Sequence, residues 1–345
     1  MRKKSDFSAE ELIACLNERG KSTVQRFGVA AISGVNNQKL ISILTNVRDY
    51  WKDVYRPALV SLACEAVGGK TEQVSGVSLA ITLASAGIGL HDDIIDSCSN
   101  KHFRRTILGT HGQDSALLAG DLLIIKGLAT MQEALMRHLE LEKVKKIIKT
   151  YMSFFIEICE AEFGEISCRR NLETELEYYR DIIWKSTADT EACTRLGAII
   201  GGGSQSEISA LGEFGRRHGF ICRLTDELKD SLNLEGYLPY RLKYESVPLP
   251  ILYAAKTSPA AFSEIKSVLE KPNMQTVDNA KILRWCFVTK AFQFVHDVAE
   301  RNVKEANQRL RSLKRGKIRT ILQLMIDKSY TDLATLPGLC LNHHS

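Results

Sequence analysis

Proline is scarce in this sequence, and the usual hairpin turns are absent. Seven prolines occur among 345 residues, none of them between Pro57 and Pro239, and there is no Asn-Gly or Asp-Gly pair. Proline breaks helices because it removes a backbone donor and clashes with the preceding turn, whereas Asn-Gly and Asp-Gly are strong hairpin signals. Residues 144–160 and 174–185 carry apolar side chains at the three- and four-residue spacing of helices. The sequence therefore predicts an all-α protein.

Paired cysteine motifs and a large charge excess are also missing. The nine cysteines form no Cys-x-x-Cys pair, which argues against zinc and thioredoxin-type sites, and their odd number argues against a disulfide framework. We therefore expect a reducing, cytoplasmic location. The net charge is 46 − 41 = +5, which is too small over this length to predict nucleic acid or an anionic membrane as the main partner.

One uncharged stretch approaches membrane-spanning length. Residues 73–90 contain no charged side chain, but they include several serines and three glycines and run directly into His91, Asp92 and Asp93. We expect a helix buried inside the protein and predict no transmembrane span. The basic N-terminus is not followed by an apolar run of signal-peptide length, so no targeting segment is expected.

Local signals predict where some elements begin and end. Ser8 and Glu11 have the spacing of a capping box, which predicts a short helix that ends near Gly20. Prolines gather at positions 239, 248 and 250, which predicts a long loop between two helical halves. No flexible linker and no short repeat period interrupt the chain, so a single large domain is expected.

The first acidic cluster consists of Asp92, Asp93 and Asp96. Residues four apart share a helix face, so Asp92 and Asp96 should point the same way. Like charges at that spacing repel each other, and a divalent cation would remove the repulsion. Magnesium typically takes one or two carboxylates and completes its shell with water and phosphate oxygens. The pattern indicates a magnesium site, and a solvated helix end is the alternative.

The second cluster, Asp226, Glu227 and Asp230, repeats this pattern. Both clusters follow strongly apolar sequence, at residues 84–90 and 219–224, so each places acids at the end of a helix that comes from the core. Two such helices facing each other would form a carboxylate cage for magnesium ions and a diphosphate. Two unrelated solvated helix ends are the alternative.

These clusters and other segments resemble the trans-isoprenyl (polyprenyl) diphosphate synthases. Residues 90–96 are similar to the family's first aspartate-rich motif, and residues 116–121 are similar to its following helix. Further similar segments are Tyr55-Arg56-Pro57, residues 65–69, Lys185-Ser186-Thr187, residues 214–230 and residues 248–254. The resemblance covers about residues 40–300 of one domain spanning 1–345, with an N-terminal helical extension (1–39) and C-terminal helices and tail (301–345).

The resemblance implies a single helical bundle of the isoprenoid synthase type, usually a homodimer, with a central apolar cavity below two facing acidic motifs. Lys185 would hold the allylic prenyl diphosphate, and Arg56 would hold isopentenyl diphosphate. The implied magnesium ligands are the acids of both motifs: Asp92, Asp93, Asp96, Asp226, Glu227 and Asp230. The implied catalytic residues are Asp92, Asp96, Lys185 and Asp226. Metal ions and cations would neutralise the diphosphate leaving group, and an apolar pocket would protect the carbocation from water.

The sequence departs from the family pattern mainly where isopentenyl diphosphate would bind. The family's Gly-Lys before the Arg-Pro segment becomes Trp51-Lys52-Asp53, and Ser85 stands where a histidine is common. Lys101 and His102 replace an arginine pair, so the bidentate guanidinium fork is lost. The candidate substrate contacts are Arg56, Lys52, Lys101, His102, Arg105, Lys185 and Arg223.

Three functions are compatible with these residues. The main hypothesis is a synthase that condenses an allylic diphosphate with isopentenyl diphosphate. A terpene cyclase or another enzyme that ionises one prenyl diphosphate is an alternative. All acids of the metal cage are present, whereas several of the family's contacts to isopentenyl diphosphate are replaced. A non-catalytic subunit of a heteromeric synthase is a further alternative, against which two complete acidic clusters argue.

Product length is expected to depend on the pocket-lining residues that precede the first cluster. Gly87 and Ile88 stand where bulky aromatics close the pocket in the family, and Ala84 lies one turn earlier, so a product of about twenty carbons or more is expected. Close helix packing at Gly87 and Ala84 is the alternative reason for their small size.

Overall fold

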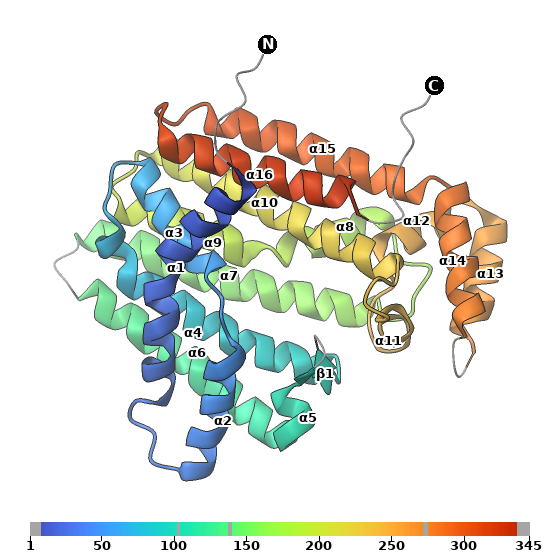
Figure 1. Ribbon diagram of the computed structural model, residues 1–345, viewed down its shortest axis with the longest axis horizontal. Helices are drawn as coiled ribbons and strands as arrows, with labels where there is room; N and C mark the ends of the chain where they lie inside the picture. The colour runs from blue at the N-terminus through green and yellow to red at the C-terminus, as the bar shows by residue number, and fades with distance from the viewer. Residues whose placement is uncertain (1–7, 102–103, 137–139, 272–274, 337–345) are drawn as a thin grey trace. The chain divides into compact units, whose positions relative to one another are not determined.

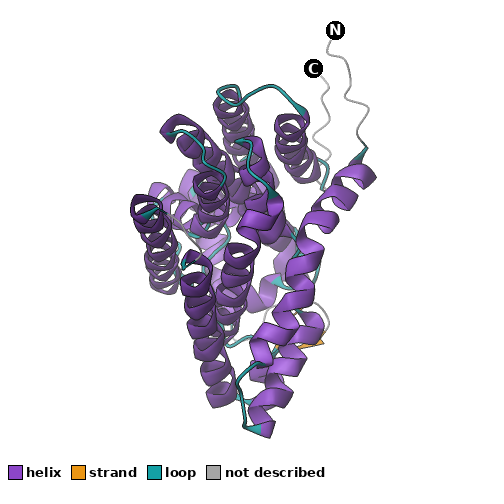
Figure 2. Cartoon of the chain, turned by 90° about the vertical axis from the view of Figure 1, so that its left-hand side faces the viewer, coloured by secondary structure: helices purple, strands orange, loops and turns teal. Residues whose placement is uncertain are grey.

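The computed structural model describes residues 8–101, 104–136, 140–271 and 275–336. These residues form sixteen α-helices and one ribbon of two short antiparallel strands, and helices dominate both views of the chain (Figures 1 and 2). The all-α prediction is confirmed. The chain divides into two compact units, each built from segments that lie far apart in the sequence.

The first unit comprises Met1–Tyr151, Ala192–Gly212 and Ser312–Ile321. Its elements are α1 (Ala9–Ile32), α2 (Gln38–Tyr50), α3 (Tyr55–Ala66), α4 (Thr71–Ile95), β1 (Asn100–Lys101), β2 (Arg104–Arg105), α5 (Ile107–His111) and α6 (Gln113–Leu135).

The second unit comprises Met152–Glu191, Glu213–Arg311 and Leu322–Ser345. Its elements are α8 (Leu176–Lys185), α11 (Leu238–Tyr244), α12 (Leu249–Thr257), α13 (Pro259–Leu269), α14 (Thr276–Val288) and α15 (Ala291–Leu310). Four helices contribute residues to both units: α7 (Leu141–Ser167), α9 (Ala188–Ile200), α10 (Gln205–Ser231) and α16 (Lys317–Ala334). The expected single domain over residues 1–345 stays a prediction.

The N-terminal helix begins as predicted but is longer than predicted. The Ser8 hydroxyl accepts from the Glu11 backbone N–H at 3.1 Å, and the Glu11 carboxylate accepts from the Ser8 N–H at 2.6 Å, which completes the capping box. The predicted end near Gly20 is wrong, because α1 continues to Ile32. A Cβ atom at Gly20 would lie 2.3 Å from the carbonyl oxygen of Val54, so this glycine permits a close approach of the chain and does not end the helix.

The predicted long loop around the clustered prolines is also wrong. Pro239 lies in the first turn of α11, and Pro250 lies in the first turn of α12. The backbone N–H of a residue in the first turn has no acceptor within the helix, so a proline there loses no hydrogen bond. The fixed φ of proline also suits the start of a helix. These prolines therefore begin two short helices.

Helices α4 and α6 of the first unit pack at very short range (Figure 1). A Cβ atom at Gly87 would lie 2.6 Å from the Gly120 carbonyl oxygen, and one at Gly127 would lie 2.8 Å from the Ala80 carbonyl oxygen. Glycine is therefore required where the two backbones approach each other. Helix α4 has the length and apolarity of a membrane span, but 72% of its most apolar stretch is buried inside the protein, as expected for a core helix.

Each unit has its own apolar core. In the first unit, α1, α2, α4 and α6 contribute fully buried side chains such as Phe27, Leu44, Leu83 and Leu123. In the second unit, α12 packs against α8, α13, α14 and α15. Burying one large aliphatic or aromatic side chain stabilises a fold by about 1.5–3 kcal/mol, so these contacts hold each helix end in a defined place.

Candidate active site

The first acidic cluster lies at the C-terminal end of α4. The Asp96 backbone N–H donates to the Asp92 carbonyl oxygen at 2.9 Å, so the helical turn continues to Asp96 and keeps the predicted one-turn spacing. The side chain of Asp92 is 32% exposed, whereas that of Asp93 is 7% exposed. The core side of α4 therefore holds Asp93, and Asp92 and Asp96 are more accessible.

A lysine from the short ribbon already lies on these carboxylates. The Nζ atom of Lys101 is 3.2 Å from Oδ2 of Asp92 and 3.7 Å from Oδ1 of Asp93. Burial raises the pKa of Asp93 to about 6, and the nearby Lys101 ammonium opposes this shift. Desolvation would lower the pKa of Lys101, but the two carboxylates outweigh it and raise that pKa above its usual value. The sequence-predicted residues Asp92, Asp93 and Lys101 are thus brought together.

The ribbon that carries Lys101 is fixed on both sides. The Thr106 hydroxyl donates to the Cys98 carbonyl oxygen at 2.7 Å, and the Arg104 guanidinium lies 3.5 Å from the centre of the Tyr50 ring. Burial raises the pKa of that tyrosine to about 12. Arg105 is exposed. His102, another predicted substrate contact, lies outside the described residues.

Two predicted contacts for isopentenyl diphosphate lie near the start of α3: Lys52 precedes the helix and Arg56 lies in its first turn. Nη1 of Arg56 is 2.9 Å from Oδ2 of Asp53, and the Lys52 ammonium donates to the Arg48 carbonyl oxygen at 3.0 Å. The Asp53 carboxylate also accepts from the Tyr55 backbone N–H at 2.9 Å, which holds the start of α3. Both cations are engaged within the protein, and their side chains are not deeply buried.

Gly87 does not border open space. The α6 backbone and the Ile124 side chain occupy the place where its side chain would be. This finding favours the packing explanation for Gly87. Ile88, the other predicted wall residue, is partly exposed.

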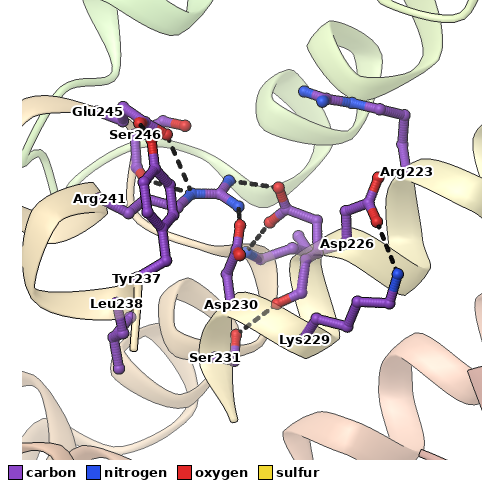
Figure 3. Close-up of polar contacts among 12 residues, drawn as sticks. Arg223, Asp226, Lys229, Asp230, Ser231, Tyr237, Leu238, Arg241, Glu245 and Ser246 are labelled. Atoms are coloured by element: carbon purple, nitrogen blue, oxygen red, sulfur yellow. Dashed lines mark hydrogen bonds and ion pairs between the residues drawn. The ribbon is translucent and has the colours of Figure 1, made fainter. Parts of the chain in front are cut away.

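The second acidic cluster lies near the end of α10 and is divided between two environments (Figure 3). The side chain of Asp226 is 54% exposed, and its Oδ1 lies 3.3 Å from the Lys229 ammonium. The side chain of Glu227 is 2% exposed, and it forms an ion pair with Arg241 of α11. Asp230 forms a second ion pair with the same guanidinium. The three acids, all implied magnesium ligands, therefore have different surroundings.

Further contacts surround this arginine. The Tyr179 hydroxyl of α8 accepts from Arg241 at 3.0 Å and lies 2.8 Å from the Ser246 hydroxyl. The second carboxylate oxygen of Glu227 accepts from the Leu249 backbone N–H. Sequence reasoning missed Arg241, because it lies eleven residues beyond Asp230 in a segment where no spacing pattern connects the two.

Two further predicted substrate contacts lie in the second unit. Lys185, the last residue of α8, lies 3.2 Å from Glu160 and 3.3 Å from Asp181, and hydrogen bonds to these carboxylates raise its pKa. It borders an open hollow of about 580 Å³, whose other lining residues are Phe155, Ile156, Cys159, Glu160 and Phe163. Arg223 lies 3.0 Å from Glu165.

The donor atoms of both clusters suit a hard divalent cation. Among the described residues, no three acidic, histidine or cysteine side chains are gathered closely enough to hold a metal ion by themselves. Magnesium needs only one or two carboxylates when phosphate oxygens and water complete its shell. Asp92 and Asp226 are accessible carboxylates, and Asp92 already attracts an ammonium group. That the two clusters face each other stays a prediction.

Comparisons with known proteins identify the family. Residues 52–284 match the family model described as "Polyprenyl synthetase". A curated relative, the short chain isoprenyl diphosphate synthase of Methanothermobacter thermautotrophicus, is 30% identical over 79% of this chain and 84% of its own length.

Solved structures agree on the fold. The geranylgeranyl pyrophosphate synthetase of Pyrococcus horikoshii Ot3 superposes with a TM-score of 0.81 at 22% identity and covers 93% of this chain and 98% of its own. A polyprenyl synthase of Caulobacter crescentus CB15, complexed with calcium and isoprenyl diphosphate, gives 0.77 at 17% identity over 95% and 99%. Other structures of this fold are named as heptaprenyl and decaprenyl synthases. The resemblance found in the sequence is confirmed, and the chain belongs to the polyprenyl synthetase family of prenyltransferases.

Proposed function

We propose that the protein condenses an allylic prenyl diphosphate with isopentenyl diphosphate to give a longer trans-prenyl diphosphate, by magnesium-assisted ionisation. Family membership supports the reaction class. The end of α4 is the observation that carries the proposal, because a buried apolar helix there presents the partly exposed carboxylate of Asp92 beside an ammonium group. This arrangement joins a cation-attracting site to an apolar interior.

The carboxylates of Asp92, Asp96 and Asp226 are the proposed magnesium ligands. When bound, magnesium would neutralise the diphosphate leaving group and so lower the barrier to breaking the allylic C–O bond. Asp93 is more buried, and its raised pKa of about 6 suits a supporting position behind Asp92. Lys101 would move from Asp92 to a diphosphate oxygen, because a surface ion pair of this kind contributes only about 0–1 kcal/mol.

Lys185 and its hollow support the allylic site. An ammonium group at the edge of an apolar lining matches a molecule with an anionic head and a hydrocarbon tail. The aromatic rings of Phe155 and Phe163 would contact the hydrocarbon tail of the allylic substrate. Glu160 and Asp181 hold the lysine in place until diphosphate replaces them.

Arg56, Lys52, Lys101 and Arg105 are the proposed contacts of isopentenyl diphosphate. Each already belongs to the unit that contains the first acidic cluster. In this proposal Arg56 exchanges its Asp53 partner for the diphosphate, and the released diphosphate of the allylic substrate accepts the proton lost after condensation.

We further propose a homodimer and a product of about twenty carbons or more. Gly87 packs against α6, so the proposed product length rests on Ile88, which is not a bulky aromatic that would close a pocket. The exposed apolar stripe of α6 supports the homodimer: Leu117, Leu118, Ile125 and Leu128 are all at least 40% exposed. A second copy of the chain would cover this face. We also propose a cytoplasmic location, which the odd number of cysteines and the lack of a Cys-x-x-Cys pair support.

One assay separates the three candidate functions. Purified protein and magnesium are incubated with isopentenyl diphosphate and each allylic diphosphate, and extracts are analysed before and after phosphatase treatment. We expect a longer alcohol that appears only after phosphatase. A hydrocarbon or cyclic alcohol formed without isopentenyl diphosphate would instead identify a cyclase, and turnover seen only with a partner chain would identify a subunit.

A further inference from the structure

A buried arginine of α10 contacts the end of α8, the helix whose last residue is Lys185. The side chain of Arg216 is 7% exposed, and its Nη1 donates to the Trp184 carbonyl oxygen at 3.0 Å. The Thr187 hydroxyl donates to the same oxygen at 2.8 Å. Carbonyl groups at the end of a helix carry partial negative charge, so a guanidinium is favourable there. Since this carbonyl belongs to the peptide group that joins Trp184 to Lys185, Arg216 holds the backbone directly before the lysine.

The other two nitrogens of this guanidinium are fixed by carboxylates. Nη2 of Arg216 lies 2.7 Å from Oε2 of Glu157 on α7, and Nε forms an ion pair with Glu191 on α9. The planar fork sets the directions of all three contacts together. A buried guanidinium keeps such partners, because losing one leaves a charge without compensation away from water. The end of α8 is thereby tied to α7 and α9 by residues that all belong to the second unit.

The ammonium group of Lys185 has partners of the opposite kind. Its side chain is 35% exposed, and the carboxylates of Glu160 and Asp181 are both more than half exposed. Ion pairs of this kind contribute little to stability, so a diphosphate can replace them. Glu160 follows Glu157 by three residues on α7 and lies on the same side of that helix. One glutamate of α7 therefore anchors the backbone before Lys185 through Arg216, and the other holds the lysine's exchangeable end.

We propose that Arg216 is a positioning residue for the allylic substrate, because it fixes the backbone from which Lys185 reaches the diphosphate. This inference rests on the proposed allylic role of Lys185. The three nitrogens of Arg216 are engaged inside the protein, so it acts through the Trp184 carbonyl and not by touching the substrate. When diphosphate takes the ammonium from its surface partners, the buried anchor keeps the lysine at the edge of the hollow. A shift of about 1 Å in a binding group can lower a rate about a hundredfold.

Equilibrium binding of an allylic thiolodiphosphate tests this role without turnover, because its C–S bond is not ionised. The full-length protein is titrated in the presence of magnesium by isothermal titration calorimetry. We expect Lys185→Gln to weaken binding by about tenfold and Arg216→Gln by about fivefold. The double variant should bind within about twofold of Lys185→Gln alone, because both changes act through one ammonium group.

A matched control comes from the first unit. The guanidinium of Arg19 is 16% exposed and holds Glu65 through two hydrogen bonds of 2.8 Å each. Arg19→Gln should lower the melting temperature as Arg216→Gln does but leave binding of the analogue unchanged. Steady-state kinetics give a second readout: Arg216→Gln should raise the KM of the allylic substrate about fivefold and leave that of isopentenyl diphosphate unchanged.

Native binding in Arg216→Gln, or losses that multiply in the double variant, would overturn the role of Arg216. An equal loss in Arg19→Gln would also overturn it, because general loosening would then explain the effect. Native binding in Lys185→Gln would instead contradict the proposed allylic site, which separates the two failures. If Arg216→Gln does not fold, Glu157→Gln removes one anchoring charge and should weaken binding by about twofold to threefold. Native binding in that variant would overturn the proposal as well.

Discussion

The two acidic clusters have almost the same sequence pattern and very different surroundings. In the first, the resident cation is Lys101, whose side chain is 41% exposed and lies beside a partly exposed Asp92. In the second, the resident cation is Arg241, whose side chain is 6% exposed and pairs with a buried Glu227. A lysine at the surface exchanges partners, whereas a buried arginine fork is part of the fold. The comparison teaches that an acid's burial, and not its place in a motif, decides whether it is available to metal.

The largest expected effect comes from removing the accessible acid of either cluster. Asp92→Asn and Asp226→Asn should each lower turnover by about a hundredfold or more, because the leaving group loses charge neutralisation. The phosphatase-coupled product assay measures this loss, and circular dichroism should show an unchanged helix content. Asp332→Asn, at an exposed residue of α16 that pairs with Lys328, is the control and should retain normal turnover. Normal turnover in either cluster variant would contradict the proposed metal role.

The next prediction compares how much an ion pair in each cluster contributes to the stability of the protein. Glu227→Gln should lower the free energy of unfolding by about 3 kcal/mol, because it leaves a buried guanidinium undercompensated. Lys101→Gln should lower it by less than about 1 kcal/mol, because that ion pair is exposed to water. Urea unfolding of the metal-free protein measures both values. Similar losses in the two variants would remove the distinction between an exchangeable and a fixed cation.

A smaller loss is expected at the helix pair that supports the first cluster. Gly87→Ala should destabilise the protein by about 2 kcal/mol, because its Cβ would overlap the α6 backbone. Gly316→Ala is the matched control, since no atom lies within 4 Å of its Cβ position. Thermal unfolding compares the two. If Gly87→Ala is as stable as the native protein and makes a shorter product, the residue borders a pocket after all.

Lowering the pH should destabilise mainly the second unit. Burial lowers the pKa of His218 from 6.5 to about 4, whereas His91 and His111 of the first unit are partly exposed. The folded state keeps His218 neutral while the unfolded state takes up a proton, so stability is lost as the pH falls from 6.5 towards 4. The melting temperature of the metal-free protein should decrease over this range, and His218→Gln should reduce the slope. An unchanged slope would assign the acid sensitivity to other groups.

Local patterns predicted a good part of the fold. The capping box at Ser8 and Glu11 was correct because both partners lie within one helical turn. The same kind of reasoning placed Asp92 and Asp226 near the C-terminal ends of helices. Features that depend on distant neighbours could not be predicted in this way. From the sequence alone, Gly20 indicates a helix end. The structure shows instead that it lies against Val54.

The environment of the candidate site was harder to predict than its residues. Glu227 and Asp226 are adjacent in sequence, yet helix geometry turns one to the core and the other to water. Arg241 pairs with Glu227 and Asp230 only once the chain has turned from α10 into α11, and that contact leaves no periodic signal in the sequence. The roles of the acids and cations in catalysis stay predictions that the variants above test.

The hollow beside Lys185 contains its own chemical reporter. Among the eight described cysteines, Cys159 is the one that is exposed, and it lines this hollow. The other thiols are buried or partly buried, so a maleimide should alkylate Cys159 first. A hydrocarbon tail lying over Phe155 and Phe163 would shield that sulfur, and slower labelling would then record occupancy directly in the unmodified protein.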